Sequence, residues 1–86
     1  DIELLQNHPN PFTQNTAIRM VLPDTVVQAD LIIYNLEGNQ IQQHLISDRG
    51  NTEISLEGGS LQPGMYIYAL IADGKIIDQK RMILTK

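Results

Sequence analysis

Apolar and polar residues alternate along this chain over short segments, with no sustained helical spacing. Turn-forming residues interrupt the pattern at intervals of roughly 8–12 residues, which is typical of all-β domains. The segments between the turns are rich in Ile, Leu, Val, Thr and Tyr, and each is too short for a capped globular helix. We therefore predict six strands: Thr16–Leu22, Gln28–Tyr34, Gln40–Ser47, Thr52–Leu56, Met65–Ala72 and Lys75–Leu84.

A seventh strand over Glu3–Gln6 could pair along a sheet edge before Pro9 and Pro11 interrupt the ladder. Proline has no N–H to donate and is tolerated mainly at edges and strand starts. The predicted fold is a small antiparallel β-sandwich of six or seven strands, in which alternate residues face the core. The core candidates are Ile18, Met20, Leu22, Leu31, Ile33, Thr52, Ile54 and Leu56.

The segment Met65–Ala72 differs from the others because it is apolar on both faces. If Tyr66 and Tyr68 face the core, the opposite face is an outward apolar stripe, and such a stripe marks a partner site. A neighbouring domain or an edge loop covering the stripe is one alternative, and a reversed assignment of the two faces is another. The stripe comprises Met65, Ile67, Ala69 and Ile71, joined by Ile32 and Val21 if their strands share the sheet.

Two residues between the last two strands indicate how those strands pair. Asp73 and Gly74 both accept positive φ, which the two central positions of a type I′ turn require. The sequence therefore predicts an antiparallel hairpin of Met65–Ala72 and Lys75–Leu84.

Composition limits the class of protein. A chain of 86 residues forms one domain that buries about 60% of its unfolded surface. Without cysteine it has no disulfides or thiolate metal sites. No secretory signal and no apolar run approaching the roughly 18 residues of a membrane span is present. Because Asp1 lies so close to the first motif, we interpret residues 1–86 as a single domain excised from a larger protein.

Charge is distributed unevenly along the chain. Residues 1–74 contain nine acidic and two basic residues, whereas residues 75–86 contain four basic residues and one acidic residue. The basic end is consistent with a solvated strand face or with a tail that docks on an acidic partner. Nucleic acid is not a predicted partner, because an acidic chain with six Lys and Arg residues lacks the basic stripe that phosphates require.

Candidate catalytic and metal-binding residues do not form a recognisable constellation. His8 and His44 have no second ligand at a suitable spacing, and Asp73 and Asp78, which could face each other across the hairpin, are more typical of solvating charge. Gly58-Gly59 lacks the spacing and the lysine of a phosphate-binding loop. We predict no enzyme activity, no cofactor and no small-molecule substrate.

Five sequence pieces follow one another along the chain: Asn10-Pro11-Phe12, Thr16–Pro23, Ile33–Gly38 with its Gly38 turn, Leu61–Tyr66 with Pro63, Gly64 and Tyr66, and Lys80–Lys86. No single piece is specific, but the ordered set, with the chain stopping at its last lysine, covers nearly the whole chain. Together the pieces resemble the type A C-terminal sorting domain of the type IX secretion system.

The resemblance implies an immunoglobulin-like sandwich that serves as a C-terminal signal on cargo of Bacteroidota-type bacteria. In this family the signal directs a covalently continuous N-terminal cargo through the periplasm and the outer-membrane translocon to the surface or the medium. A sortase often removes it upstream of the Asn-Pro-Phe region and attaches the cargo to lipopolysaccharide. Family members often carry charged residues at the positions of Ile32 and Ala69, and this chain departs from that pattern.

A recognition mechanism follows from the hairpin. Gly64 allows a sharp turn after Pro63, and Gly74 reverses the chain so that the basic tail forms the terminal strand. A receptor could read that strand by strand addition, with Lys80, Arg81, Ile83 and Lys86 as candidate recognition residues. On this hypothesis deletion of residues 83–86 leaves the cargo folded but unsecreted, and Gly64→Val disturbs folding.

The main alternative is a non-catalytic accessory module of a surface enzyme, either a glycan-binding sandwich or a stalk. Glycan platforms generally need exposed aromatic residues, and only Phe12, Tyr34, Tyr66 and Tyr68 are available here. A stalk is expected to continue at both ends.

Overall fold

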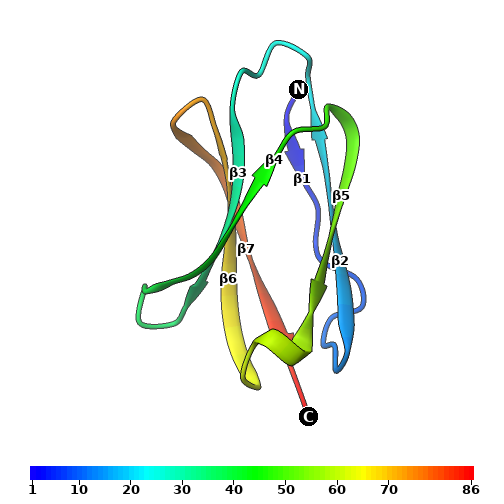
Figure 1. The fold of residues 1–86 in the computed structure, drawn as a ribbon, viewed down its shortest axis with the longest axis vertical. Helices are drawn as coiled ribbons and strands as arrows, with labels where there is room; N and C mark the ends of the chain where they lie inside the picture. Colours follow the sequence, from blue (N-terminus) through cyan, green and yellow to red (C-terminus); the bar gives the residue numbers. More distant parts are fainter.

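A computed structural model describes all of residues 1–86. It contains seven strands in two antiparallel sheets, so the predicted immunoglobulin-like sandwich is confirmed. The three-stranded sheet has the order β1-β2-β5 and the four-stranded sheet the order β4-β3-β6-β7 (Figure 1). The strands are β1 (Glu3–Leu4), β2 (Asn15–Leu22), β3 (Ala29–Asn35), β4 (Gln40–Ile46), β5 (Gly50–Glu57), β6 (Gly64–Ala72) and β7 (Lys75–Leu84).

Most strand boundaries match the predicted ones to within one or two residues. The first strand is shorter than predicted because, although the N–H of Leu5 still donates to the carbonyl of Arg19 in β2 at 3.0 Å, the carbonyl of Leu5 accepts a hydrogen bond from Tyr68 in the opposite sheet. Conversely, β5 is longer than predicted, since Gly50 and Glu57 still pair with the two ends of β2. The single helical turn, Gly58–Ser60, is 3-10, and no helix could cross a membrane.

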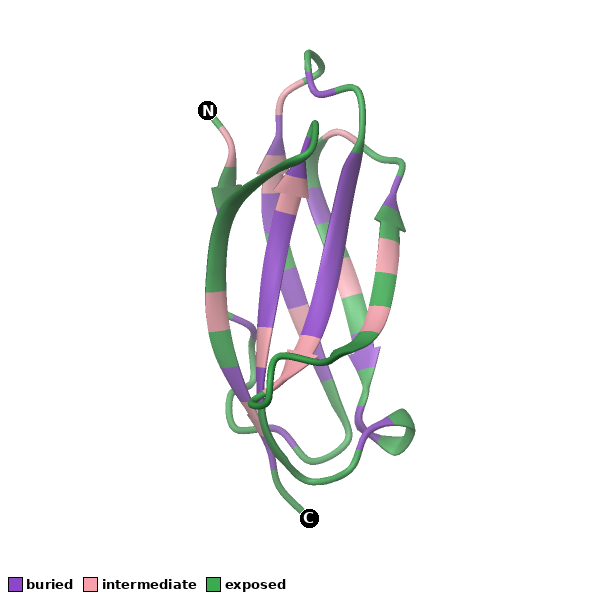
Figure 2. Ribbon diagram, turned by 90° about the vertical axis from the view of Figure 1, so that its left-hand side faces the viewer, coloured by how far each residue is buried: buried purple, intermediate pink, exposed green.

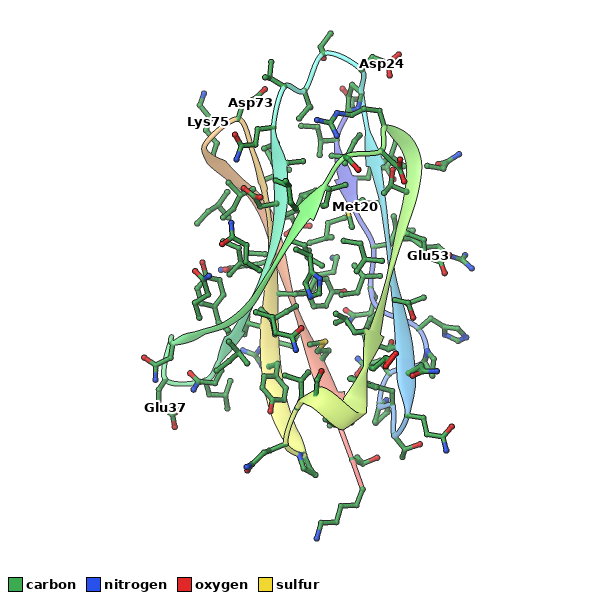
Figure 3. All side chains as sticks on the ribbon, in the orientation of Figure 1. Met20, Asp24, Glu37, Glu53, Asp73 and Lys75 are labelled. Atoms are coloured by element: carbon green, nitrogen blue, oxygen red, sulfur yellow. The ribbon has the colours of Figure 1, made fainter.

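The core lies between the two sheets, as the alternation predicts. Met20 points into the space between the sheets (Figure 3). The central strands β3 and β6 are buried, whereas β4 and β7 at the edges of the same sheet are largely exposed (Figure 2). Of the predicted core residues, Ile54 alone is only half-buried, and the others, including Ile18, Leu22, Leu31, Ile33, Thr52 and Leu56, are buried.

The closing hairpin has the predicted turn. Asp73 has φ 50° and Gly74 has φ 81°, which are the two positive values of a type I′ turn. Asp73 and Asp78 do not face each other: Asp73 Oδ1 accepts hydrogen bonds from the N–H groups of Val27 and Gln28, at 2.9 and 2.8 Å. The hairpin tip, where Asp73 and Lys75 lie (Figure 3), is therefore tied to the loop before β3.

The apolar stripe is only partly exposed. Tyr66 and Tyr68 face the core, which decides between the two assignments that the sequence left open. Ile32 lies in the same sheet opposite Ala69, but Val21 lies in the other sheet. Ala69 and Ile32 are nevertheless buried, because long side chains on the same face flank them. Gln79 opposes Ala69, and Gln43 opposes Ile32. Met65 remains exposed at the end of the stripe, while Ile67 and Ile71 are half-buried.

Candidate recognition site at the C-terminal strand

The C-terminal end of β7 is hydrogen-bonded on both sides. On one side β7 pairs with β6, and on the other side Phe12 forms a parallel bridge with Leu84. The N–H of Phe12 donates to the carbonyl of Ile83 at 2.9 Å, and the N–H of Thr85 donates to the carbonyl of Phe12 at 2.8 Å. The Phe12 ring is 2% exposed, so it closes the core at this edge. Phe12 and the end of β7, which are far apart in sequence, are thus joined by backbone hydrogen bonds along a line of contact that we call the seam.

Side chains extend this cover along the strand. Asn10 Oδ1 accepts a hydrogen bond from the N–H of Ile83 at 2.9 Å, and Gln6 Nε2 donates to the carbonyl of Arg81 at 2.6 Å. Pro11, which lies between the two bonded residues of the motif, has no N–H that would need a partner. The Asn10-Pro11-Phe12 motif therefore satisfies the backbone of β7 as a structural cover. Its alternation of side-chain and main-chain bonds is not visible in the sequence.

Tyr68 anchors residues 6–12, which we call the covering segment, to the four-stranded sheet. Its hydroxyl accepts a hydrogen bond from the N–H of Asn7 and donates one to the carbonyl of Leu5, both at 2.8 Å. Burial raises the pKa of Tyr68 to about 12; the hydrogen bond from Asn7 opposes this shift and the negative charge of Asp78 adds to it. The phenol is therefore neutral at neutral pH and can make both bonds.

Asn7 links the same segment to the other sheet. Its side chain is buried, and its Nδ2 donates to Thr16 Oγ1 at 3.0 Å and to the carbonyl of Pro9 at 3.2 Å. Thr16, also buried, donates to the same carbonyl at 2.7 Å. The sequence reading missed this network, because nothing local distinguishes Asn7 from an exposed loop residue.

The Pro63-Gly64 turn has the role that the sequence predicts. Gly64 adopts φ 154°, a region that disfavours side chains, at the first position of β6. Tyr66 then enters the core, and its hydroxyl donates to the carbonyl of Gln62 at 2.5 Å. This resembles the tyrosine corner of immunoglobulin-like domains, in which a tyrosine hydroxyl bonds to the backbone just upstream. Gly38 has φ 89° in the turn between β3 and β4.

Gly58 supports the end of β7 by close packing, which the sequence reading did not detect. A Cβ atom there would lie 2.9 Å from Leu84 Cδ1 and 3.0 Å from the carbonyl oxygens of Thr13 and Gln14. Its N–H donates to the Gln14 carbonyl at 2.6 Å. Gly59 next to it has open space around the same position. Only one glycine of the pair is therefore required by packing.

The four candidate recognition residues do not share one face. Arg81 opposes Ile67 and Ile83 opposes Met65, so both lie on the outer face of the four-stranded sheet. Lys80 lies on the alternate face, where its Nζ is 3.7 Å from Asp78 Oδ2. Lys86 is exposed beyond the end of β7. The structure thus brings together Arg81 and Ile83, with Lys86 further along the chain and Lys80 on the other side.

Strand addition along Lys80–Lys86 would meet an edge whose backbone is already paired at Arg81, Ile83 and Thr85. The carbonyls of Arg81 and Ile83 and the N–H groups of Ile83 and Thr85 already have partners in residues 6–12. A receptor strand could pair there only by displacing that segment. Side chains on the outer face remain available.

The two histidines lie on different parts of the fold, His8 beside β2 and His44 on β4. His8 is exposed and exchanges backbone hydrogen bonds of 2.9 Å with Ala17, while the His44 ring nitrogen Nε2 lies 2.9 Å from Gln42 Oε1. No three His, Asp or Glu side chains are grouped so that they could hold a metal ion.

Comparison with known proteins gives one match. A family model described as a secretion system C-terminal sorting domain matches residues 7–85. That range begins at the buried Asn7 and ends at Thr85, so it includes both the covering segment and the strand that it covers. No curated protein matches the chain.

Proposed function

Because the chain belongs to the family of secretion system C-terminal sorting domains, we propose that the outer face of β7 is the address that the type IX outer-membrane translocon reads on a covalently attached cargo. As a sorting signal of this family, the domain directs export of that cargo to the cell surface or the medium. Its role is targeting, so any catalysis belongs to the cargo or to the processing machinery.

One observation carries the proposal: β7 contributes to the core and to the surface at once. Met82 and Leu84 are buried, whereas Arg81, directly before Met82, is exposed on the outer face. The core residues fix the position of the strand, so the exposed ones have a defined geometry. Since residues 75–86 are basic in an otherwise acidic chain, an acidic receptor surface would favour this end.

The test fuses residues 1–86 to an inert reporter in a host that carries the type IX machinery. We expect the wild-type fusion to reach the surface or the medium. Arg81→Glu combined with Lys86→Glu should abolish most export while leaving the thermal unfolding of the purified domain unchanged, because both side chains are exposed.

Lys75→Glu is the matched control for each single reversal, Arg81→Glu or Lys86→Glu, since it makes the same charge change on β7 at the exposed hairpin tip. Normal export of the double variant would refute the proposed address. Equal loss of export in the Lys75 control would show that net charge, rather than position, determines recognition.

Deletion of residues 83–86 is not a clean test, contrary to the sequence-based prediction. It removes Leu84, which is 3% exposed, together with the backbone groups of Ile83 and Thr85 that pair with Phe12. The truncation should therefore unfold the domain as well as remove the address. Surface charge reversal separates the two effects.

Processing extends the proposal. We infer that residues 1–86 are the C-terminal sorting unit of a larger protein, and that a sortase removes it upstream of Asn10-Pro11-Phe12 and attaches the cargo to the surface. The structure supports a cut before this segment, because residues 5–12 are integrated into both sheets through Tyr68, Asn7 and Phe12. Cleavage upstream of this segment would release an intact domain. Mass spectrometry of the released fragment tests its first residue.

The glycan-binding alternative lacks a platform. Phe12, Tyr66 and Tyr68 are buried, and Tyr34 is half-buried. No pair of exposed aromatic rings is therefore present on which a sugar could stack.

A further inference from the structure

The two sheets end in four edge strands, and three of these are protected against pairing with another chain. An edge strand presents unpaired N–H and C=O groups. Proteins usually prevent these groups from pairing with another chain by short strands, charged side chains or a covering segment. β1 has two residues, β5 carries Glu53 and Glu57, and Glu53 points away from the sandwich (Figure 3). β7 carries four charged residues besides its covering segment.

β4 has none of these three protections, and its one irregularity is a bulge at Ile41, where its register against β3 shifts. Its sequence, Gln-Ile-Gln-Gln-His-Leu-Ile, contains no Asp, Glu, Lys, Arg, Pro or Gly, and it forms the outermost strand of its sheet. An open hollow lined by residues of both strands, including Gln42 and Glu57, separates it from β5. On its outer face it exposes Leu45 (71%) and Ile41 (42%). This edge is uncharged, apolar on one face and open.

We propose that β4 pairs antiparallel with β4 of a second copy of this chain, about a two-fold axis at Gln43. In this register Gln43 opposes its own symmetry mate, and Ile41 opposes Leu45 on both sides of the axis. All of these side chains lie on the outer face, so each exposed apolar residue covers another. The two four-stranded sheets become one continuous sheet of eight strands, within the ordinary size range.

Register singles out a second copy as the occupant. An axis at Gln42 places Ile41 opposite glutamine, and an axis at His44 places Leu45 opposite glutamine. An axis at Ile41 or at Leu45 pairs that residue with its own symmetry mate but leaves the other without an apolar partner, so only the axis at Gln43 gives both residues one. Because β4 carries no formal charge at neutral pH, the symmetric pair brings no like charges together, which would be destabilising.

The proposed dimer is compatible with the sorting role and independent of it. β7 lies at the opposite edge of the sheet, and β1, near the chain start, packs beside β7. Arg81 and Lys86 therefore stay accessible in both copies. Loss of dimerisation leaves export by the single domain unchanged, so the two proposals fail separately.

Sedimentation equilibrium of the purified chain tests the association. We expect a 9.7 kDa species at low concentration and a species of twice that mass as concentration rises toward about 1 mM. Gln43→Lys places two ammonium groups side by side at the axis, which should weaken association on the order of tenfold. Gln79→Lys, an exposed glutamine on the same face at the other edge, should leave it unchanged.

A thiol cross-link tests the register. The chain has no cysteine, so Gln43→Cys introduces a single thiol whose Cβ lies about 5 Å from its symmetry mate in the dimer. A short bis-maleimide, which alkylates one thiol at each end, should join Gln43→Cys chains at least several-fold faster than Gln79→Cys chains. A single monomeric species up to about 1 mM overturns the proposal. Equal cross-linking of both variants does the same. Either result would mean that β4 pairs with a strand of a different protein instead.

Discussion

The two edges of the four-stranded sheet, β7 and β4, differ in whether their free backbone groups are covered. β7 is the longer and is basic, and residues 6–12 bond to its backbone at Arg81, Ile83 and Thr85. β4 is uncharged and has no covering segment. In the C-terminal strand the backbone groups are covered and the outer side chains remain accessible. In β4 the edge backbone groups themselves are free to pair.

Phe12→Ala should have the largest effect on this comparison. It removes a ring that is 2% exposed at the seam between β7 and the covering segment, and should lower the free energy of unfolding by about 3–5 kcal/mol. Leu45→Ala on the exposed β4 should change it by less than about 0.5 kcal/mol. Urea unfolding at micromolar protein measures both. Equal effects would mean that the seam contributes no more to stability than the open edge.

Gly58→Ala should destabilise the domain by about 1–3 kcal/mol, because the new Cβ meets Leu84 and two backbone carbonyls at 2.9–3.0 Å. Gly59→Ala is the matched control, since its Cβ enters open space. The difference between the two melting temperatures is the measurement. If both variants melt together, the end of β7 has room that the structure does not show.

Tyr68→Phe should lower the free energy of unfolding by about 1–2 kcal/mol, because the N–H of Asn7 and the carbonyl of Leu5 both lose their partner. It should also change the pH dependence. The tyrosine pKa rises from 10.0 to about 12 on folding, so its contribution is complete below pH 10 and is lost as pH rises toward 12.

Between pH 9 and 12 the free energy of unfolding should therefore fall more steeply with pH for the wild type than for Tyr68→Phe. Parallel curves would show that the phenol titrates equally in the folded and unfolded states, and that the anchor between the covering segment and β6 is weaker than its geometry indicates.

Asn10→Ala should have the smallest effect on stability, about 1 kcal/mol, since it removes one hydrogen bond to the N–H of Ile83 at an exposed edge. Hydrogen exchange is the sharper measurement, and the Ile83 amide should exchange at least several-fold faster. Asn35→Ala removes the comparable bond to the Asn39 N–H in the turn before β4, and should accelerate that amide alone. Slow exchange of Ile83 in Asn10→Ala would assign its protection to another group.

Local pattern was sufficient to predict most of the fold. Alternation and turn residues located six strands, and the Asp73-Gly74 pair specified the hairpin, because side-chain period and turn geometry depend on near neighbours alone. The inward direction of Tyr66 and Tyr68 did not follow from the alternation, because Met65–Ala72 is apolar on both faces, and only burial in the structure decides it.

The candidate site could be predicted only in part. The basic tail was visible, but its separation onto two faces, with Lys80 bound to Asp78 and Arg81 outward, depends on register with β6. The burial of Ala69 and Ile32 depends on which glutamines oppose them in neighbouring strands. Such pairings join residues far apart in the chain.

By itself, then, the sequence determined an all-β domain with a closing hairpin and a basic end, because these features arise from local periodicity and composition. Tertiary structure alone decided that Asn10 and Phe12 occupy the backbone edge of the last strand, that Asn7 and Tyr68 hold them there, and that Gly58 lies against Leu84. These contacts span up to 73 residues, and no local preference encodes a partner at that distance.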